Sequence, residues 1–190
     1  MYKYELQGNK FLRLLRAFNR RFRGIIFILF RVINSSSYYV TFGKGARIIG
    51  SRNIFFNKNF SVGINSRIET HTLKDIPIIK FGENVSFGDN LHIGATSKII
   101  ISSGVLAGSN ILIIDHNHGD VKNDLLTKSN IPPKKRIIVN TGDIFIGENV
   151  WIADNVVILG GTIVGEGSVI SAGTIVKGHF NPYSLIRGNK

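Results

Sequence analysis

The sequence predicts a mainly β protein, a parallel β-solenoid built from six-residue repeats. In the C-terminal part, large aliphatic residues recur at every sixth position, and a smaller or β-branched residue stands four places after each of the first five. The recurring aliphatics are Ile146, Ile152, Ile158, Val164, Ile170 and Val176. A helix would space apolar residues about 3.6 apart, and an ordinary strand would alternate over a longer run. A period of six fits neither and is typical of a short strand and a turn that repeat, which indicates a solenoid.

The repeats begin earlier, near Val40, with a less regular phase. The earlier series are Phe42, Ile48 and Ile54; Phe56, Val62 and Ile68; Phe81, Phe87 and Ile93; and Ile101, Ala107 and Ile113. We expect a longer corner to absorb each shift of phase, and Pro77 with residues 72–75 to form a bulged corner or small loop. Nearly all of residues 40–180 is therefore predicted to be one solenoid, in a domain that spans 39–190.

One long loop interrupts the solenoid at about 114–145. Its residues lack the six-residue period, and they include a Pro-rich basic stretch at 132–136 and an apolar triplet at 137–139 that predicts a return strand. Some 30 non-periodic residues inserted into a regular solenoid usually carry function.

Residues 1–38 form a different segment. Residues 1–33 contain eight basic residues and one acidic residue, interleaved with Phe and Leu, and an apolar run follows at 25–30. This pattern predicts a basic amphipathic helix. The uncharged run of 24–30 is far shorter than the roughly 20 residues that a membrane-spanning helix needs, and no signal-peptide cleavage site follows it.

Two interpretations of the N-terminal helix stay open. It packs on the solenoid or on a neighbouring subunit with its arginines in water, or residues 10–33 contact the surface of a membrane whose anionic headgroups attract the basic side. Nucleic-acid binding is disfavoured because no recognition motif accompanies the charge.

Composition limits the functional classes. With 190 residues, 43% hydrophobic and 19% charged, the chain is globular and forms one domain with an appendage. The absence of cysteine excludes disulfides, thiolate zinc sites and a Cys nucleophile, and it fits a cytoplasmic protein. The net charge of +12 favours an anionic partner surface, such as an acidic glycan, a phosphorylated substrate or anionic lipid.

The strongest local motif is DHNHG at residues 115–119, where the chain leaves the solenoid for the loop. A neutral imidazole can accept the proton of a hydroxyl, because its ordinary pKa of about 6.5 lies near neutral pH. Asp115, or a backbone carbonyl, would then hold the imidazole tautomer that leaves the other nitrogen free. His118 is expected to be a loop residue that supports the base, and His71, His92 and His179 are expected at the surface or at corners.

The stretches 146–152 (IGENVWI), 158–163 (ILGGTI) and 165–173 (GEGSVISAG) closely resemble the C-terminal coils of hexapeptide-repeat acyltransferases. The resemblance implies a left-handed parallel β-helix with three hexads per coil. It also implies a homotrimer with active sites between subunits and acetyl-CoA as the acyl donor. By this resemblance, His116 matches the histidine that ends a coil before the loop and acts as general base in galactoside- and maltose-type acetyltransferases.

The resemblance assigns further residues. Trp151 matches a tryptophan in the first hexad after the loop of surface-polysaccharide O-acetyltransferases, and with Arg136 it is expected to line the groove for acceptor and donor. Hexad alignment matches Asp154, Ala172 and Lys177 to positions that contact coenzyme A. The C-terminus ends earlier than in such relatives, which gives Arg187 and Lys177 a larger share of nucleotide binding.

The predicted function is acetyl-CoA-dependent O-acetylation of a sugar hydroxyl on a capsular, exopolysaccharide or O-antigen-type glycan. The net positive charge of the protein is compatible with an acidic glycan as the acceptor. The alternatives are N-acetylation of an amino sugar nucleotide, acetylation of a small xenobiotic molecule, and a non-catalytic β-helix that serves as a binding scaffold. No metal site is expected, because the third ligand that a carbonic-anhydrase-like zinc site requires is missing.

Overall fold

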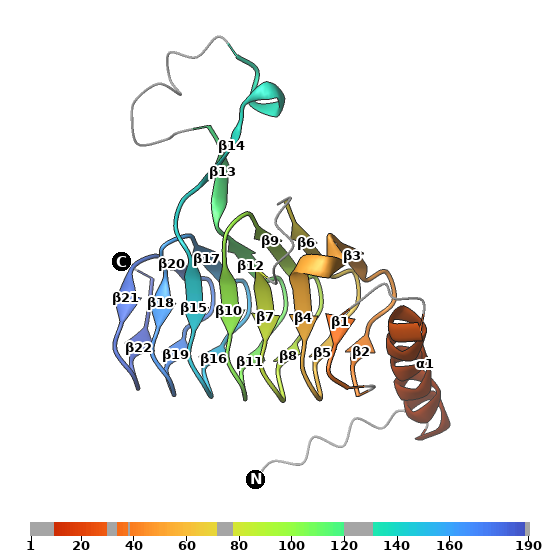
Figure 1. The fold of residues 1–190 in the computed structure, drawn as a ribbon. Coiled ribbons are helices and arrows are strands. Elements are labelled where there is room, and N and C mark those ends of the chain that lie inside the picture. The colour runs from red at the N-terminus through yellow and green to blue at the C-terminus, as the bar shows by residue number, and fades with distance from the viewer. Residues whose placement is uncertain (1–9, 30–33, 38, 72–77, 120–130, 189–190) are drawn as a thin grey trace.

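The computed structural model describes residues 10–29, 34–37, 39–71, 78–119 and 131–188, and it shows a three-sided solenoid with a hairpin standing off one corner (Figure 1). Each coil contributes short parallel strands to three sheets, which we call A, B and C. The expected parallel β-helix is confirmed.

Sheet A contains β1 (Asn34–Ser35), β4 (Ile54–Phe56), β7 (Ile79–Phe81), β10 (Ile99–Ile101), β15 (Ile144–Ile146), β18 (Ile163–Val164) and β21 (His179–Phe180). Sheet B contains β2 (Thr41–Phe42), β5 (Ser61–Val62), β8 (Ser86–Phe87), β11 (Leu106–Ala107), β16 (Trp151–Ile152), β19 (Val169–Ile170) and β22 (Leu185–Ile186). Sheet C contains β3 (Arg47–Ile49), β6 (Arg67–Thr70), β9 (His92–Ala95), β12 (Leu112–Ile114), β17 (Val157–Leu159) and β20 (Ile175–Val176).

The coils differ in length along the solenoid. Trp151 of β16 lies beside Val169 of β19, eighteen positions away, as three hexads require. In the N-terminal half, Thr41 lies beside Ser61, twenty positions away. The two additional residues lie in the corner between sheet C and sheet A, where residues 49–53 connect Ile48 to Ile54 and include a short 3-10 helix, whereas residues 159–161 connect the equivalent Ile158 and Thr162. The prediction that a longer corner absorbs the phase shift is therefore confirmed.

Asparagines at the corners hold the coils in register. Asn90, Asn110 and Asn155 each have a positive φ of 58° or 59°, a conformation that Asn tolerates better than most residues. Their side chains form a ladder in which Asn90 Nδ2 donates to Asn110 Oδ1 at 2.9 Å, and Asn110 Nδ2 donates to Asn155 Oδ1 at 3.1 Å. The tight corner and the link between coils thus come from the same side chain.

The core changes character along the solenoid axis. At the N-terminal end it is aromatic, because Phe42, Phe56, Phe60 and Phe81 are all buried, with neighbouring ring centroids 4.6–5.7 Å apart. Farther along, the core consists of aliphatic residues at the predicted positions, such as Ile146, Ile152 and Ile158. The six-residue pattern therefore identified the core correctly.

Helix α1 (Lys10–Leu29) covers the N-terminal end of the solenoid (Figure 1). Phe27 packs on Phe42 with a centroid distance of 5.3 Å. Gly24 allows the close approach of the two backbones, since a Cβ at this position would lie 2.0 Å from the Val40 carbonyl oxygen. The helix is therefore attached to the first coil.

Two arginines of α1 point toward the solenoid. Arg20 Nη2 donates to the carbonyl of Val62 at 2.9 Å, and Arg23 Nε donates to the carbonyl of Phe42 at 3.0 Å. For these two residues the expectation of arginines in water is wrong, because strand carbonyls at the solenoid's end accept their hydrogen bonds. The solenoid also begins earlier than expected, since β1 within the predicted segment 1–38 pairs with β4.

The remaining elements are two short 3-10 helices, η1 (Ser51–Asn53) and η2 (Pro133–Lys135), and the antiparallel hairpin of β13 (His116–His118) and β14 (Ile138–Asn140). The return strand predicted at 137–139 is thus confirmed within one residue. The predicted bulge at 72–77 and the middle of the loop at 120–130 lie outside the described residues. In the described part of the chain, no helix is both long and apolar enough to cross a membrane.

The aromatic end of the core makes a testable contribution to stability. Phe60 is fully buried, so Phe60→Ala should lower the free energy of unfolding by about 3–5 kcal/mol, because the cavity it leaves cannot close. Urea denaturation measures this loss. Phe18→Ala, at a side chain that is 65% exposed, is the matched control and should change it by about 0.5 kcal/mol or less. Equal losses in the two variants would contradict the assignment of the core.

Candidate active site at the hairpin corner

The candidate site lies where the chain leaves the solenoid between sheet C and sheet A. Strand β12 ends at Ile114, Asp115 follows, and His116 begins β13. His116 lies opposite Asn140 in the antiparallel hairpin, and Thr141 donates its backbone N–H to the Asp115 carbonyl at 2.7 Å. The regular coil therefore opens at Asp115 and closes again at Thr141.

Asp115 is completely buried and serves as an acceptor for several donors. Its carboxylate accepts from the Thr96 N–H at 2.8 and 3.0 Å, from the Thr96 hydroxyl at 3.0 Å and from the Ser97 N–H at 2.8 Å. Charge-assisted bonds of this kind compensate the loss of hydration of a buried carboxylate. The carboxylate is thus held rigidly by the β9–β10 corner.

His116 is the neighbour that this carboxylate orients. Its Nδ1 lies 3.2 Å from Asp115 Oδ1, so the tautomer that satisfies both groups carries its hydrogen on Nδ1. The ring is 7% exposed and lies over Gly94, where a Cβ would come within 3.1 Å of the ring's Cε1. Gly94 therefore provides the space for the imidazole. In the tautomer with its hydrogen on Nδ1, Nε2 carries no hydrogen and can accept one.

A second carboxylate lies on the other side of Gly94. Glu69 of β6 is 4% exposed and accepts from Arg67 Nε at 2.7 Å. Its Oε1 lies 3.0 Å from His92 Nε2 and 3.5 Å from His71 Nε2. Burial acts to raise the pKa of Glu69, but the hydrogen bonds from His92 and Arg67, and the charges of Arg67 and His71, lower it below its usual value of 4.5.

The two carboxylates belong to one continuous cluster. The rings of His71 and His116 meet edge to face with a centroid distance of 5.4 Å. Glu69 lies beside Gly94 in the register of β6 and β9, and Arg67 lies beside His92. The structure thus brings three histidines together at one corner, although residue 71 and residue 92 were expected to be surface or corner residues without a role in the site.

A signal for this cluster exists in the sequence. The five-residue segments 67–71 (RIETH), 92–96 (HIGAT) and 112–116 (LIIDH) occupy equivalent places in three successive coils, and they pair through β6, β9 and β12. His71 and His116 therefore hold the same position two coils apart. The insertion at 72–77 hides this alignment from a search at a fixed period.

The other loop residues lie farther out on the hairpin. His118 is exposed and pairs with Ile138. Arg136 follows η2 and uses its Nε to bond the Ile131 carbonyl at 2.9 Å. Both residues belong to the outer part of the hairpin, whereas His116 lies at its base.

Trp151 lies on a different side of the three-sided solenoid from His116. It stands on β16 of sheet B, between Leu106 and Val169, and is 53% exposed. His116 lies at the corner between sheets C and A. One chain therefore does not bring Trp151 and His116 into one pocket.

The residues aligned with coenzyme A contacts separate into two groups. Lys177 and Arg187 line the same cavity of about 430 Å³ at the C-terminal end, together with Gly173, Ile175 and Phe180. Ala172 is exposed next to Gly173. Asp154, by contrast, accepts the backbone N–H of Ser109 at 2.6 Å, which gives its carboxylate a role in joining two coils.

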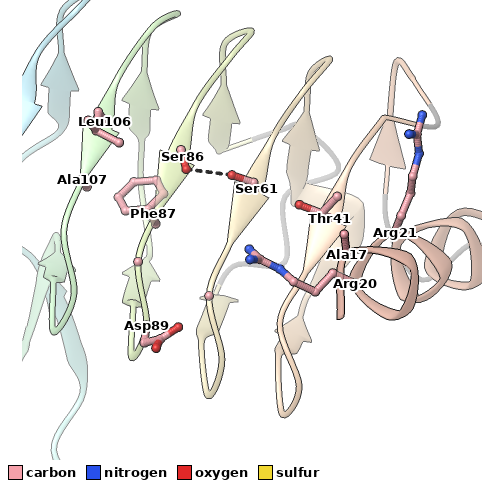
Figure 2. Close-up of a pocket in the computed structure, with 12 residues that line it drawn as sticks. Ala17, Arg20, Arg21, Thr41, Ser61, Ser86, Phe87, Asp89, Leu106 and Ala107 are labelled. Carbon is pink, nitrogen blue, oxygen red and sulfur yellow. Dashed lines mark hydrogen bonds between the residues drawn. The ribbon is translucent and has the colours of Figure 1, made fainter. Parts of the chain in front are cut away.

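A further groove of about 550 Å³ runs between α1 and sheet B (Figure 2). Arg20 and Arg21 line one end, Ser61 and Ser86 share a hydrogen bond of 2.8 Å, and Leu106 lies at the other end. The groove occupies the sheet that carries Trp151, away from the His116 corner. In the described ranges, no cluster of three or more His, Cys, Asp or Glu side chains is arranged to hold a metal ion.

The carboxylate of Glu69 makes a pH-dependent contribution to stability. Because its pKa is lower in the folded chain, it stabilises the fold above the unfolded value of about 4.5, and this contribution disappears as the pH falls through the folded value. Glu69→Gln should therefore reduce the free energy of unfolding by on the order of 1–2 kcal/mol at neutral pH.

Chemical denaturation over a pH series measures this effect. The difference between wild type and Glu69→Gln should shrink as the solution is acidified below the unfolded pKa. Glu148→Gln, at an exposed corner, is the control and should show no such dependence. A difference that is constant with pH would show that Glu69 contributes only through packing.

Comparisons with known proteins agree with this architecture. Residues 143–178 match the family model described as bacterial transferase hexapeptide (six repeats). A search of curated proteins gave no significant match. A similar solved structure is a mutant of AntD, an N-acyltransferase from Bacillus cereus, in complex with dTDP-4-amino-4,6-dideoxyglucose and coenzyme A. It is 15% identical to this chain, with a TM-score of 0.55, over 84% of this chain and 83% of that one.

The matched repeats are those that the six-residue period predicted, and the structural match extends over most of the solenoid. Residues 143–178 thus consist of hexapeptide repeats, and the chain has the left-handed parallel β-helix fold.

Proposed function

We propose that the protein is an acyltransferase that moves an acetyl group from acetyl-CoA to a sugar hydroxyl of a surface-type glycan, with His116 as the general base. The observation that carries this proposal is the Asp115–His116 pair. A buried, fully hydrogen-bonded carboxylate holds Nδ1 of the imidazole, and the pair stands at the base of a hairpin on a hexapeptide solenoid.

The proposed reaction is a direct transfer. His116 Nε2 takes the proton of the acceptor hydroxyl while that oxygen attacks the thioester carbonyl. The tetrahedral intermediate collapses, the C–S bond breaks, and the thiolate of coenzyme A takes the proton from the imidazolium. Asp115 stabilises the imidazolium and keeps the ring oriented throughout. The six-residue repeats supply the rigid support, and Gly94 provides the space for the ring.

On the donor side, we propose that Lys177 and Arg187 contact the phosphates of coenzyme A in the C-terminal cavity that they share. Both side chains are exposed cations, and guanidinium and ammonium groups bind phosphate well. Ala172 would let the pantetheine arm approach the backbone at the same end. Asp154 is a weaker candidate, because its carboxylate already accepts from the Ser109 amide.

We propose a homotrimer, in which the active site is completed between neighbouring chains. A single chain presents His116 at one corner, Trp151 on sheet B and the Lys177–Arg187 cavity at its end. A neighbouring subunit would supply the second wall that the His116 corner needs and would place a Trp151 side chain near a His116 of another chain. Arg136 on the hairpin would then reach the acceptor.

The acceptor distinguishes two candidate functions. The complex of AntD with an amino sugar nucleotide favours N-acylation as the second candidate. A hydroxyl acceptor needs a base such as His116, whereas a neutral amine is already nucleophilic, so the Asp115–His116 pair favours O-acetylation. A base-labile ester on the product would support the first function, and an alkali-stable amide would support the second.

We place the reaction in the cytoplasm, where acetyl-CoA is available, at the inner face of a membrane on which glycans are assembled. The absence of cysteine fits a reducing compartment. The charge of +12 fits an anionic surface or an acidic acceptor.

His116→Ala should abolish acetyl transfer to a glycan acceptor, a loss of at least roughly 10²–10⁴-fold, because no other group would remove the hydroxyl proton. Transfer is measured by mass spectrometry of the acceptor after incubation with acetyl-CoA. His118→Ala is the matched control two residues away on the same strand and should keep most of the activity. A His116→Ala protein that remains folded and still transfers acetyl groups would refute the assignment.

The Lys177→Ala/Arg187→Ala double variant should raise the KM for acetyl-CoA by roughly tenfold or more, with little change in kcat, because phosphate contacts are made equally in the ground and transition states. Acetyl-pantetheine, which lacks the nucleotide, is the control donor and should serve the variant and the wild type equally well. A larger loss with acetyl-pantetheine than with acetyl-CoA would contradict this role.

A further inference from the structure

Helix α1 exposes a continuous apolar stripe. Leu14, Phe18, Phe22 and Leu29 are 70%, 65%, 51% and 66% exposed. At about 100° per residue these four positions fall on one side of the helix. Phe18 and Phe22 stack on each other with a centroid distance of 6.0 Å. The stripe is therefore an ordered surface and contains two large aromatic side chains.

In the part of the chain that the structure describes, nothing covers this stripe, because the opposite side of α1 is the one attached to the solenoid. Gly24 and Phe27 contact the first coil, and the Arg20 and Arg23 guanidiniums donate to its carbonyls. Figure 2 shows Arg20 reaching from the helix toward the strands of sheet B. Arg20 and Arg23 thus point inward beside Phe27, while Phe18 and Phe22 point outward, so much of the apolar surface of the helix is left outside the core.

We infer that the outer face of α1 is a docking surface for an anionic lipid bilayer. A helix of this kind lies in the plane of the interface, with its apolar side chains buried roughly 5–10 Å into the boundary between headgroups and acyl chains. Exposed Arg21 has its guanidinium 4.5 Å from the ring centroid of exposed Tyr39. This pair offers lipid headgroups a cation and an aromatic ring.

Charge favours lipid over a second copy of the chain. Residues 1–33 carry eight basic residues and one acidic residue. If the same stripe packed against its counterpart in another chain, these charges would be brought together and would repel. An anionic bilayer instead attracts this net positive charge, with exposed Arg21 beside the stripe and Arg20 and Arg23 turned toward the solenoid. The apolar stripe and the charge therefore point to the same partner.

This orientation also suits a membrane-bound acceptor. Helix α1 covers the N-terminal end of the solenoid, and the β13–β14 hairpin stands off another side (Figure 1). Docking through the outer face of α1 would thus leave the hairpin corner uncovered. The inference stands on the helix alone and does not depend on the proposed acyltransferase chemistry.

The experiment is flotation of the full chain with vesicles made of equal parts phosphatidylcholine and phosphatidylglycerol, compared with phosphatidylcholine alone. Wild type should float with the anionic vesicles and stay in the dense fraction with the neutral ones. Phe18→Gln/Phe22→Gln should partition at least roughly tenfold more weakly, because two large apolar side chains are lost while the charge and the helical propensity are kept. Arg21→Gln should weaken binding to the anionic vesicles by a smaller factor.

The matched control is Ile64→Gln/Ile137→Gln, which removes two exposed apolar side chains from elsewhere on the surface and should float as wild type does. Circular dichroism and the mass of the particle in solution are measured for every variant.

The inference is overturned if wild type fails to float with the anionic vesicles, or if Phe18→Gln/Phe22→Gln floats as well as wild type. It is also overturned if that variant forms smaller oligomers than wild type in lipid-free buffer, because a second copy would then be the occupant of the stripe. Acetyl transfer to a soluble acceptor is assayed separately, so failure here leaves the role of His116 unaffected.

Discussion

The stacking of parallel coils decides which residues of this protein can meet. Each strand bonds to the strands one coil before and one coil after it, so a side chain's neighbours are residues eighteen, twenty or more positions away in the sequence. Hydrogen-bonded asparagine ladders at the corners hold this register. The register matters because a shift by one residue would move the whole inward-facing set of side chains to the surface. A polar site therefore forms wherever polar residues recur at equivalent places in successive coils.

The candidate active site is such a place, and it is also where the stacking is interrupted. Sheet C carries Glu69 on β6, Gly94 on β9 and the Asp115–His116 turn after β12. A side chain larger than hydrogen at position 94 would fill the space that the imidazole occupies. The chain then leaves the coil, which frees the edge of the imidazole from the next coil. The two buried carboxylates, Glu69 and Asp115, and the opening of the coil thus lie at the same corner between sheet C and sheet A.

The sequence predicted the parts of this arrangement that depend on period and local chemistry. Inward aliphatics such as Ile152 follow from the spacing, and Asp115 with His116 follows from a motif at the end of a coil. Glu69, His71 and His92 were not predicted, because their proximity depends on the coil length, which is twenty positions in the N-terminal half and is lengthened further by the segment 72–77. The direction in which the Arg20 and Arg23 side chains point was also beyond prediction. Amphipathicity identifies an apolar face and a polar face, but does not determine which of them meets the protein.

The orientation of α1 has a physical explanation at the N-terminal end of the solenoid. Among the described residues, β2 is the outermost strand of sheet B, and an exposed edge strand invites association with other chains. An apolar helix face would cover such an edge but would leave strand carbonyls without donors. Arginines satisfy this need, as Arg23 does for the Phe42 carbonyl, while Phe27 and Gly24 make the close contacts. Once the side of α1 that carries Arg20, Arg23 and Phe27 closes the solenoid, the side that carries Phe18 and Phe22 faces outward, so the closure of the edge and the exposed stripe have a single structural cause.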